Sequence, residues 1–182
     1  MAKASYQAEL KENIREGLSK ELNEKNIHAL PHLEKVVVSI GIGSMMQKSK
    51  DFSAVANNLT ILTGQKCVVK KSKIAISNFK LRQGMPVGLM VTLRGKKMYA
   101  FVAKLVHVIF PRVRDFRGLS TQSFDGQGNY SIGLKEQTVF PEIRQDDDIM
   151  IHGVQITFST SAKTADEGKA LLIHMGLPFQ KK

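Results

Sequence analysis

Apolar residues recur every third or fourth position in four segments of the chain, which is the spacing of one face of a helix. The expected helices are Tyr6 to about Asn23, about Lys50 to Thr63, Gly95 to Pro111, and a last helix from Thr164 to Gly176. Thr164 and Glu167 form a capping-box pair, and Gly64 and Gly176 stand where a left-handed helix end favours glycine.

Other segments are rich in β-branched residues or alternate apolar with polar positions, as strands do. The expected strands are Lys35 to Gly41, Lys66 to Ile76, Val87 to Arg94, Tyr130 to Leu134 and Ile149 to Ser159. In the third of these, alternation places Leu89, Val91 and Leu93 on one face and Thr92 and Arg94 on the other.

The second and third strands are expected to pair as a hairpin around the loop Ser77 to Pro86, whose Gly-Met-Pro end is a turn signal. A longer loop, Arg112 to Asn129, shows no apolar period and is typical of loops kept for function. The order of elements predicts an α+β fold with an antiparallel sheet, helices packed on one face and long functional loops. We expect one domain, residues 1–182.

Charge is concentrated in the middle of the chain. The protein has a net charge of +11. The segment Phe52 to Arg114 carries twelve Lys and Arg residues and no Asp or Glu, whereas the rest of the chain has fifteen Lys and Arg residues and sixteen Asp and Glu residues. A surface of one sign is tolerated best opposite a polyanion, so nucleic acid is the leading partner. An anionic membrane face and a merely solvated rim are the alternatives.

No apolar stretch reaches membrane-spanning length, so we expect no membrane association. A single cysteine, Cys67, and no N-terminal apolar run of the signal-peptide kind favour a cytoplasmic location.

Nine cations gather on the predicted hairpin and its flanks: Lys66, Lys70, Lys71, Lys73, Lys80, Arg82, Arg94, Lys96 and Lys97. One aromatic residue, Phe79, lies among them. Cations around an exposed ring can grip single-stranded or looped RNA, because the ring stacks on a base while the cations neutralise phosphates. Packing of Phe79 under its own loop is an equal alternative.

Catalysis and metal binding find little support in the sequence. The chain has no phosphate-binding Walker loop and no dinucleotide-binding glycine motif. His28 and His32 are four apart, but Pro31 interrupts a helix there and no further ligand completes a zinc set. The run Asp146 to Asp148 is better explained as a solvated loop than as a metal cage. We therefore expect no catalytic residue, no metal and no cofactor.

Sequence motifs do not narrow the nucleic acid further. The RNA-recognition-motif signature, the KH loop and a recognition helix for DNA are all missing. Residue-level reasoning therefore indicates a binder of structured RNA. An RNA chaperone or nuclease-like enzyme and a protein-interaction module using Arg112 to Asn129 are the rivals.

Four long strings carry a specific family likeness: LTGQKCVVKKSKIAISNFKLRQGMPVG, VTLRG, FPRVRDFRGLSTQSFDGQGNYSIGLKEQTVFPEI and STSAKTADEGKALL. They closely resemble the bacterial large-subunit ribosomal protein family number five, the 5S-rRNA binders, over essentially the full chain. The resemblance implies a non-enzymatic protein of the ribosome that attaches 5S rRNA to 23S rRNA in the central protuberance. It also implies contacts with P-site tRNA, with small-subunit ribosomal protein thirteen and with other central-protuberance proteins.

Carried onto this sequence, the resemblance implies three sets of site residues. The rRNA-binding set is Ser39, Gln65, Lys66, Asn78, Phe79, Thr92 and Arg94. The tRNA-contacting loop is Lys80, Arg82, Gln83, Gly84, Met85 and Pro86. The inter-subunit face is Arg112, Arg114, Asp115, Phe116 and Arg117. Three positions depart from the family pattern, because relatives commonly have Asn at Ser39, an aromatic at Met85 and an acid at Gln155.

Overall fold

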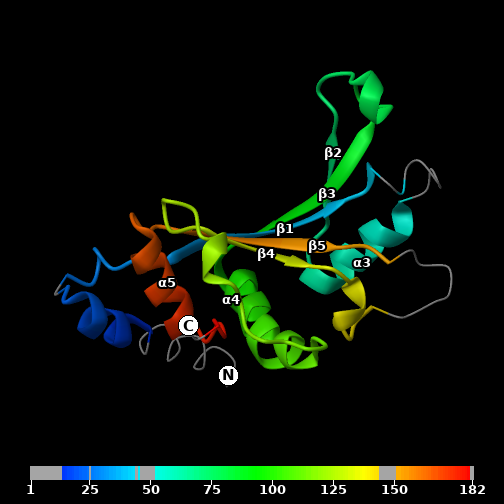
Figure 1. Ribbon diagram of the computed structural model, residues 1–182. Helices are drawn as coiled ribbons and strands as arrows, with labels where there is room; N and C mark the ends of the chain where they lie inside the picture. The colour runs from blue at the N-terminus through cyan, green and yellow to red at the C-terminus, as the bar shows by residue number, and fades with distance from the viewer. Residues whose placement is uncertain (1–13, 25, 44, 46–51, 144–150, 181–182) are drawn as a thin grey trace. The chain divides into compact units, whose positions relative to one another are not determined.

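The computed structural model describes residues 14–24, 26–43, 45, 52–143 and 151–180 (Figure 1). Its strands are β1 (Leu33–Gly41), β2 (Val68–Lys71), β3 (Pro86–Leu93), β4 (Tyr130–Leu134) and β5 (Val154–Thr160). Its main helices are α3 (Ser53–Thr63), α4 (Gly95–Lys104) and α5 (Ala165–His174), and a further helix covers residues 14–22. The five strands form one sheet in the order β2-β3-β1-β5-β4. The predicted α+β class with an antiparallel sheet is confirmed.

The chain groups into two compact units. Unit 1 comprises Met1–Val36, Arg94–Ile132 and Thr157–Lys182, and unit 2 comprises Val37–Leu93 and Gly133–Ile156. The boundaries fall inside β1, β4 and β5, so each of these strands contributes residues to both units. The expectation of a single domain over residues 1–182 stays a prediction, because this grouping describes contacts and not cooperative folding.

Unit 2 is built on the alternation that the sequence predicts. Leu89, Val91 and Leu93 of β3 are buried, and the residues between them are only half-buried. Helix α3 contacts β3 (Figure 1) and buries Val55, Leu59 and Leu62. Gly64 closes α3 at φ 65°, where its N–H donates to the Thr60 carbonyl at 2.8 Å. A left-handed residue at this position satisfies a carbonyl that the helix leaves unpaired, as expected.

Unit 1 shows how a capping signal fixes a helix. The Thr164 hydroxyl accepts from the Glu167 N–H at 3.3 Å, and the Glu167 carboxylate accepts from the Lys163 N–H at 2.9 Å. The predicted pair thus caps α5, although the carboxylate reaches the residue before the cap. Gly168 of α5 and Gly128 approach so closely that a Cβ on Gly168 would overlap the Gly128 backbone. Gly176 follows α5 at φ 87°.

Two predicted strand boundaries are wrong. The strand expected over Lys66 to Ile76 is only β2, because its register shifts between Lys70 and Lys71 and the Ser72 hydroxyl then donates to the Ile74 carbonyl at 2.7 Å. The strand expected from Ile149 begins at Val154; residues 149 and 150 lie outside the described part.

The helix expected from Gly95 to Pro111 changes its winding on the way. After α4 the backbone makes a π-helical turn over Leu105–Ile109 and a 3-10 turn over Phe110–Arg112. Leu105 and Ile109 stay buried through this change, so the apolar stripe that predicted the helix is preserved. A π-turn adds a residue to the turn without breaking the stripe, and spacing alone does not reveal it.

Candidate nucleic-acid interface

The candidate interface is built on a two-stranded ribbon in unit 2. We call residues 66–93, which comprise β2, β3 and the loop between them, the cationic hairpin. In its paired part Val68 lies opposite Met90 and Val69 opposite Leu89. The pairing of the antiparallel strands confirms the hairpin that the sequence predicts.

Hydrogen bonds continue beyond the strands toward the tip of the hairpin. The Ser72 N–H donates to the Met85 carbonyl at 2.8 Å, and the Gly84 N–H donates to the Ser72 carbonyl at 3.0 Å. Nearer the tip, Ile76 and Leu81 exchange backbone hydrogen bonds of 3.0 and 3.1 Å. The loop is therefore tied to itself at two levels, and its side chains are held on a defined backbone.

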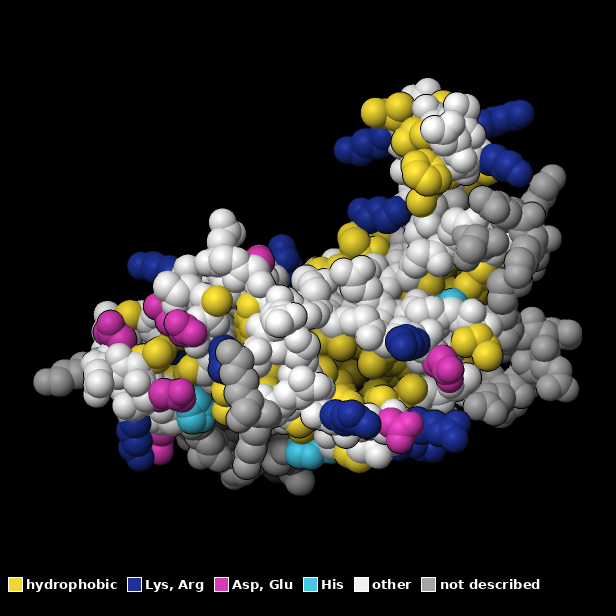
Figure 2. Space-filling model, viewed as in Figure 1, with side chains coloured by type: hydrophobic (Ala, Val, Ile, Leu, Met, Phe, Trp, Pro, Cys, Tyr) yellow, Lys and Arg dark blue, Asp and Glu magenta, His cyan; other side chains and the backbone are white. Residues whose placement is uncertain are grey.

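All six cations of the cationic hairpin are exposed: Lys66, Lys70, Lys71, Lys73, Lys80 and Arg82. Figure 2 shows dark blue side chains on both sides of the hairpin tip and no magenta between them on the visible face. Since the sequence has no acid between Phe52 and Arg114, no carboxylate within this stretch compensates their charge. Such a surface attracts polyanions and is sensitive to salt.

Apolar side chains are exposed between these cations. Phe79 ends a short 3-10 turn, Ser77–Phe79, and is 66% exposed, so the alternative in which it packs under its loop is not what the structure shows. Ile74 is 72% exposed and Ile76 43%. The sequence pattern does not reveal this exposure, because both isoleucines fall within the strand expected over Lys66 to Ile76. Apolar and aromatic surface among cations suits nucleobases, which stack without regard to charge.

Beside Phe79 the surface is hollowed by a cavity of about 560 Å³, lined by Gly43, Phe79, Lys80, Leu81, Met85, Pro86 and Val87. Lys80 adopts a left-handed backbone at φ 53° directly after the 3-10 turn, and its N–H donates to the Ser77 carbonyl at 2.9 Å. The ring of Phe79 and the Lys80 side chain thus flank one concave surface, an arrangement that can receive a base and its phosphate together.

The predicted rRNA-binding set falls mostly on unit 2. Ser39 of β1 and Thr92 of β3 are half-buried between buried neighbours, on the side of their strands turned away from the core, as expected for Thr92. The Gln65 amide donates to the Thr92 carbonyl at 3.2 Å, which brings these two predicted residues together. Lys66 and Asn78 are exposed. Arg94, exposed at the N-cap of α4, belongs to unit 1.

The six residues of the predicted tRNA-contacting loop differ in exposure. Lys80, Arg82, Gln83 and Gly84 are exposed, whereas Met85 and Pro86 are half-buried. The Met85 sulfur accepts from the Arg82 N–H at 3.2 Å, so this side chain closes its own turn. Gly84 has φ 84°, a conformation that a side chain would strain. Four of the six residues are thus available to a partner.

The predicted inter-subunit set lies in unit 1 and begins at Arg112, the last residue of the 3-10 turn. Arg112, Arg114, Asp115 and Arg117 are exposed. Phe116 is half-buried because its ring stacks on Phe110, with centroids 5.3 Å apart and planes 13° from parallel. Phe116 therefore anchors the segment, and the charged residues on either side of it face solvent.

The rest of the long loop is ordered by its own polar groups. The Asp125 carboxylate accepts from the Asn129 N–H at 2.7 Å and from the Gln127 N–H at 3.0 Å. The Asn129 side chain donates to it as well, and these hydrogen bonds lower the pKa of Asp125. Tyr130 at the start of β4 donates to the Ser120 carbonyl at 2.7 Å, and burial raises its pKa to about 12.

Within the described ranges no three His, Cys, Asp or Glu residues gather as metal ligands. Asp146, Asp147 and Asp148 lie outside the described residues. Cys67 is half-buried and its thiol donates to the Ala56 carbonyl at 3.6 Å, in keeping with a packed residue. In the part of the chain that the structure describes, no helix has the length and apolar character needed to cross a bilayer.

Comparison with known proteins identifies the family. The family model for ribosomal protein L5 matches residues 26–82, and the model for the C-terminus of the same ribosomal family matches residues 86–179. The chain belongs to the ribosomal protein L5 family. It is therefore a structural component of the large ribosomal subunit and not an enzyme, and it resides with the ribosome in the cytoplasm.

Individual relatives agree over nearly their whole length. The large ribosomal subunit protein uL5 of Trichlorobacter lovleyi is 50% identical, with 96% of each chain covered. That of Prochlorococcus marinus strain NATL1A is 48% identical over 98% of this chain and 99% of the relative. That of Dictyoglomus turgidum is 54% identical over 86% of this chain and 88% of the relative. The family resemblance seen in the sequence is confirmed.

Proposed function

We propose that this L5-family protein binds 5S rRNA through the cationic hairpin and the adjoining open face of its strands, and so helps attach 5S rRNA to 23S rRNA in the central protuberance. The observation that carries this proposal is the coincidence of six exposed cations with an exposed Phe79 on one acid-free ribbon. Cations supply affinity for phosphates, and an exposed ring supplies stacking on an unpaired base.

Individual residues take distinct parts in this contact. Phe79 stacks on a base at the rim of the cavity beside it. Thr92 and Ser39 offer hydroxyls to ribose or phosphate on the open face. Arg94, two residues further along the chain, donates a forked pair of hydrogen bonds to phosphate or to a base edge.

Two further contacts belong to the same proposal. The exposed residues Lys80, Arg82, Gln83 and Gly84 reach P-site tRNA, where Gly84 lets the backbone approach closely. The exposed charges around Phe116, namely Arg112, Arg114, Asp115 and Arg117, meet small-subunit ribosomal protein thirteen across the subunit interface. Other central-protuberance proteins are expected as neighbours.

Arg94→Ala tests the rRNA contact. If the guanidinium binds phosphate or a base, its loss weakens 5S rRNA binding by on the order of 1–3 kcal/mol. The matched control is Lys135→Ala, which removes an exposed cation from the charge-balanced remainder of the chain. Equal dissociation constants for wild type and Arg94→Ala, measured by gel shift at fixed salt, would remove Arg94 from the interface.

A further inference from the structure

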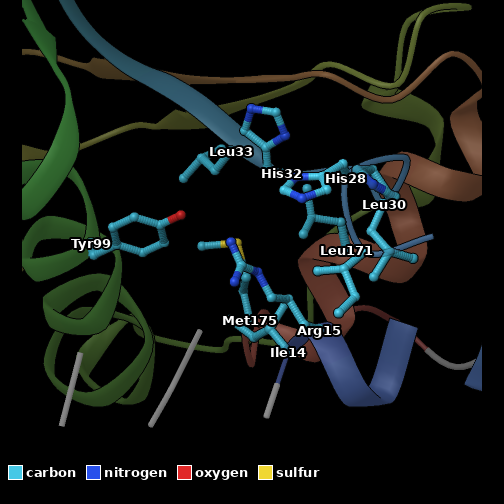
Figure 3. Close-up of a pocket in the computed structure, with 11 residues that line it drawn as sticks. Ile14, Arg15, His28, Leu30, His32, Leu33, Tyr99, Leu171 and Met175 are labelled. Atoms are coloured by element: carbon cyan, nitrogen blue, oxygen red, sulfur yellow. The ribbon is translucent and has the colours of Figure 1, made fainter. Parts of the chain in front are cut away.

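A pocket in unit 1, remote in sequence from the cationic hairpin, combines an apolar floor with a polar rim that includes Arg15 (Figure 3). Its cavity volume is about 220 Å³. The floor consists of buried side chains from three separate parts of the chain: Ile14, Leu30, Leu33, Leu171 and Met175. None of the sequence motifs pointed to this site, because its residues come together only in the fold.

Four polar side chains stand around this floor. Figure 3 shows the Tyr99 hydroxyl directed into the space that Arg15, His28 and His32 border. The described residues that line the pocket include no Asp or Glu. Among these described residues, an anionic group entering the pocket meets donors and positive charge and no competing carboxylate.

The fold holds the two histidines in place. The Ser161 hydroxyl oxygen lies 2.9 Å from His32 Nδ1. A hydrogen bond at Nδ1 leaves Nε2 as the ring nitrogen that a ligand can reach. The His28 N–H donates to the Asn26 side chain at 3.0 Å, and the Ala29 N–H donates to the Asn26 carbonyl at 3.0 Å. This turn presents the His28 ring at the pocket. Burial raises the pKa of Tyr99, and the charge of Arg15 lowers it in part, so the phenol stays protonated at neutral pH.

Size and chemistry together restrict the occupant. Drug-sized ligands need about 300 Å³ or more, whereas an apolar cavity of about 150 Å³ holds one benzene ring. A space of about 220 Å³ therefore holds one ring system, and the rest of a larger ligand lies outside the cavity beside the exposed Arg15, His28 and His32. A planar ring fits between apolar walls and the Met175 sulfur, and a phosphate fits Arg15 and the histidines.

We propose that this pocket binds a single nucleotide, with the base on the apolar floor and the phosphate at Arg15, His28 and His32. The nucleotide is an unstacked residue of ribosomal RNA or a free mononucleotide. In the first case the inference rests on the proposed RNA-binding function and adds a second RNA contact, which captures a base and not only the backbone. Bases splayed out of a structured RNA are received in this way by stacking and edge contacts.

The test follows the histidine ring signals of the full chain by NMR. The probes are the 5′-monophosphates of adenosine, guanosine, cytidine and uridine, ribose 5-phosphate, and a 5S rRNA transcript. Nucleotides are expected to shift the ring signals of His28 and His32 and leave exposed His107 unmoved. Ribose 5-phosphate, which lacks the base, is expected to bind at least about tenfold more weakly.

Two variants and a control identify the contacts. Arg15→Gln is expected to weaken nucleotide binding at least about tenfold, because the substitution removes a charged pair of hydrogen bonds to phosphate. Tyr99→Phe keeps the ring and removes only the hydroxyl, so it tests the hydroxyl separately from the ring. Lys20→Gln takes the same charge from the same helix, outside this pocket, and is expected to change nothing.

The outcomes separate this inference from the proposed function. If the transcript binds through the cationic hairpin while neither it nor any mononucleotide shifts His28 and His32, the pocket inference is overturned and the function stands. If mononucleotides bind but the transcript does not, the pocket stands as a free-nucleotide site and the proposed function fails. Shifts with the transcript alone assign the nucleotide to the RNA chain.

Discussion

Neutralising three lysines of the cationic hairpin is expected to flatten the salt dependence of 5S rRNA binding. The change is Lys70→Gln, Lys71→Gln and Lys73→Gln together. All three side chains are exposed and follow one another along β2 and the start of the loop, so the substitutions leave the core untouched. Glutamine keeps most of the length and polarity while it removes the charge.

The size of the effect follows from counterion release. Each phosphate neutralised contributes about 0.7 to 0.9 to the slope of the logarithm of the binding constant against the logarithm of salt concentration. If the six exposed cations of the hairpin each meet one phosphate, the wild-type slope is roughly −4 to −5. With three cations left, it is roughly −2 to −3.

Gel shifts or fluorescence titrations from about 50 to 200 mM salt measure both slopes, a range in which phosphate contacts dominate the change in affinity. The control is Lys20→Gln, Lys135→Gln and Lys163→Gln, which removes three exposed charges from the charge-balanced remainder of the chain. The control is expected to keep nearly the wild-type slope. Equal slopes for the two triple variants would show that only net charge matters and would rule out an interface at the hairpin.

The fold makes further predictions. Gly168→Ala is expected to destabilise the protein by about 1–3 kcal/mol in urea denaturation, because its Cβ would overlap the Gly128 backbone, whereas Gly126→Ala, with open space around it, should change little. Tyr130, whose pKa burial raises from 10.0 to about 12, stays protonated longer in the folded than in the unfolded chain, so stability falls as pH rises from about 10 to about 12. Tyr130→Phe should reduce that loss, as thermal melts across this range would reveal. Finally, far-ultraviolet dichroism and tyrosine fluorescence are expected to report one coincident unfolding transition, since β1, β4 and β5 each run through both units; two separate transitions would contradict the single-domain prediction.

The spacing of apolar residues predicted the helices and strands well, because the regularly spaced apolar residues are the ones that the fold buries. Leu89, Val91 and Leu93 alternate in sequence and are buried on one face of β3, and the stripe that ends at Leu62 marks the buried side of α3. The end of β2 could not be predicted, since a register shift at Lys71 depends on how β3 pairs with it and not on local composition.

The positive charge of the cationic hairpin was predictable from the sequence, but the exposure of its apolar side chains was not. An acid-free run of cations identified the hairpin, whereas the exposure of Ile74 and Ile76 depends on the loop folding on itself instead of extending β2. The pocket in unit 1 joins residues near positions 30, 99 and 171. His28 and His32 were visible in the sequence only as an incomplete metal set, because their partners are distant along the chain.

The acid-free, cationic hairpin of this L5-family protein is proposed to grip folded ribosomal RNA. A gel shift at low salt with a 5S rRNA transcript, tRNA and duplex DNA decides whether it does. We expect 5S rRNA to be bound more tightly than either competitor and to be released steeply as salt rises. Failure to bind 5S rRNA in dilute buffer, or equal affinity for duplex DNA, would show that the hairpin does not have this role.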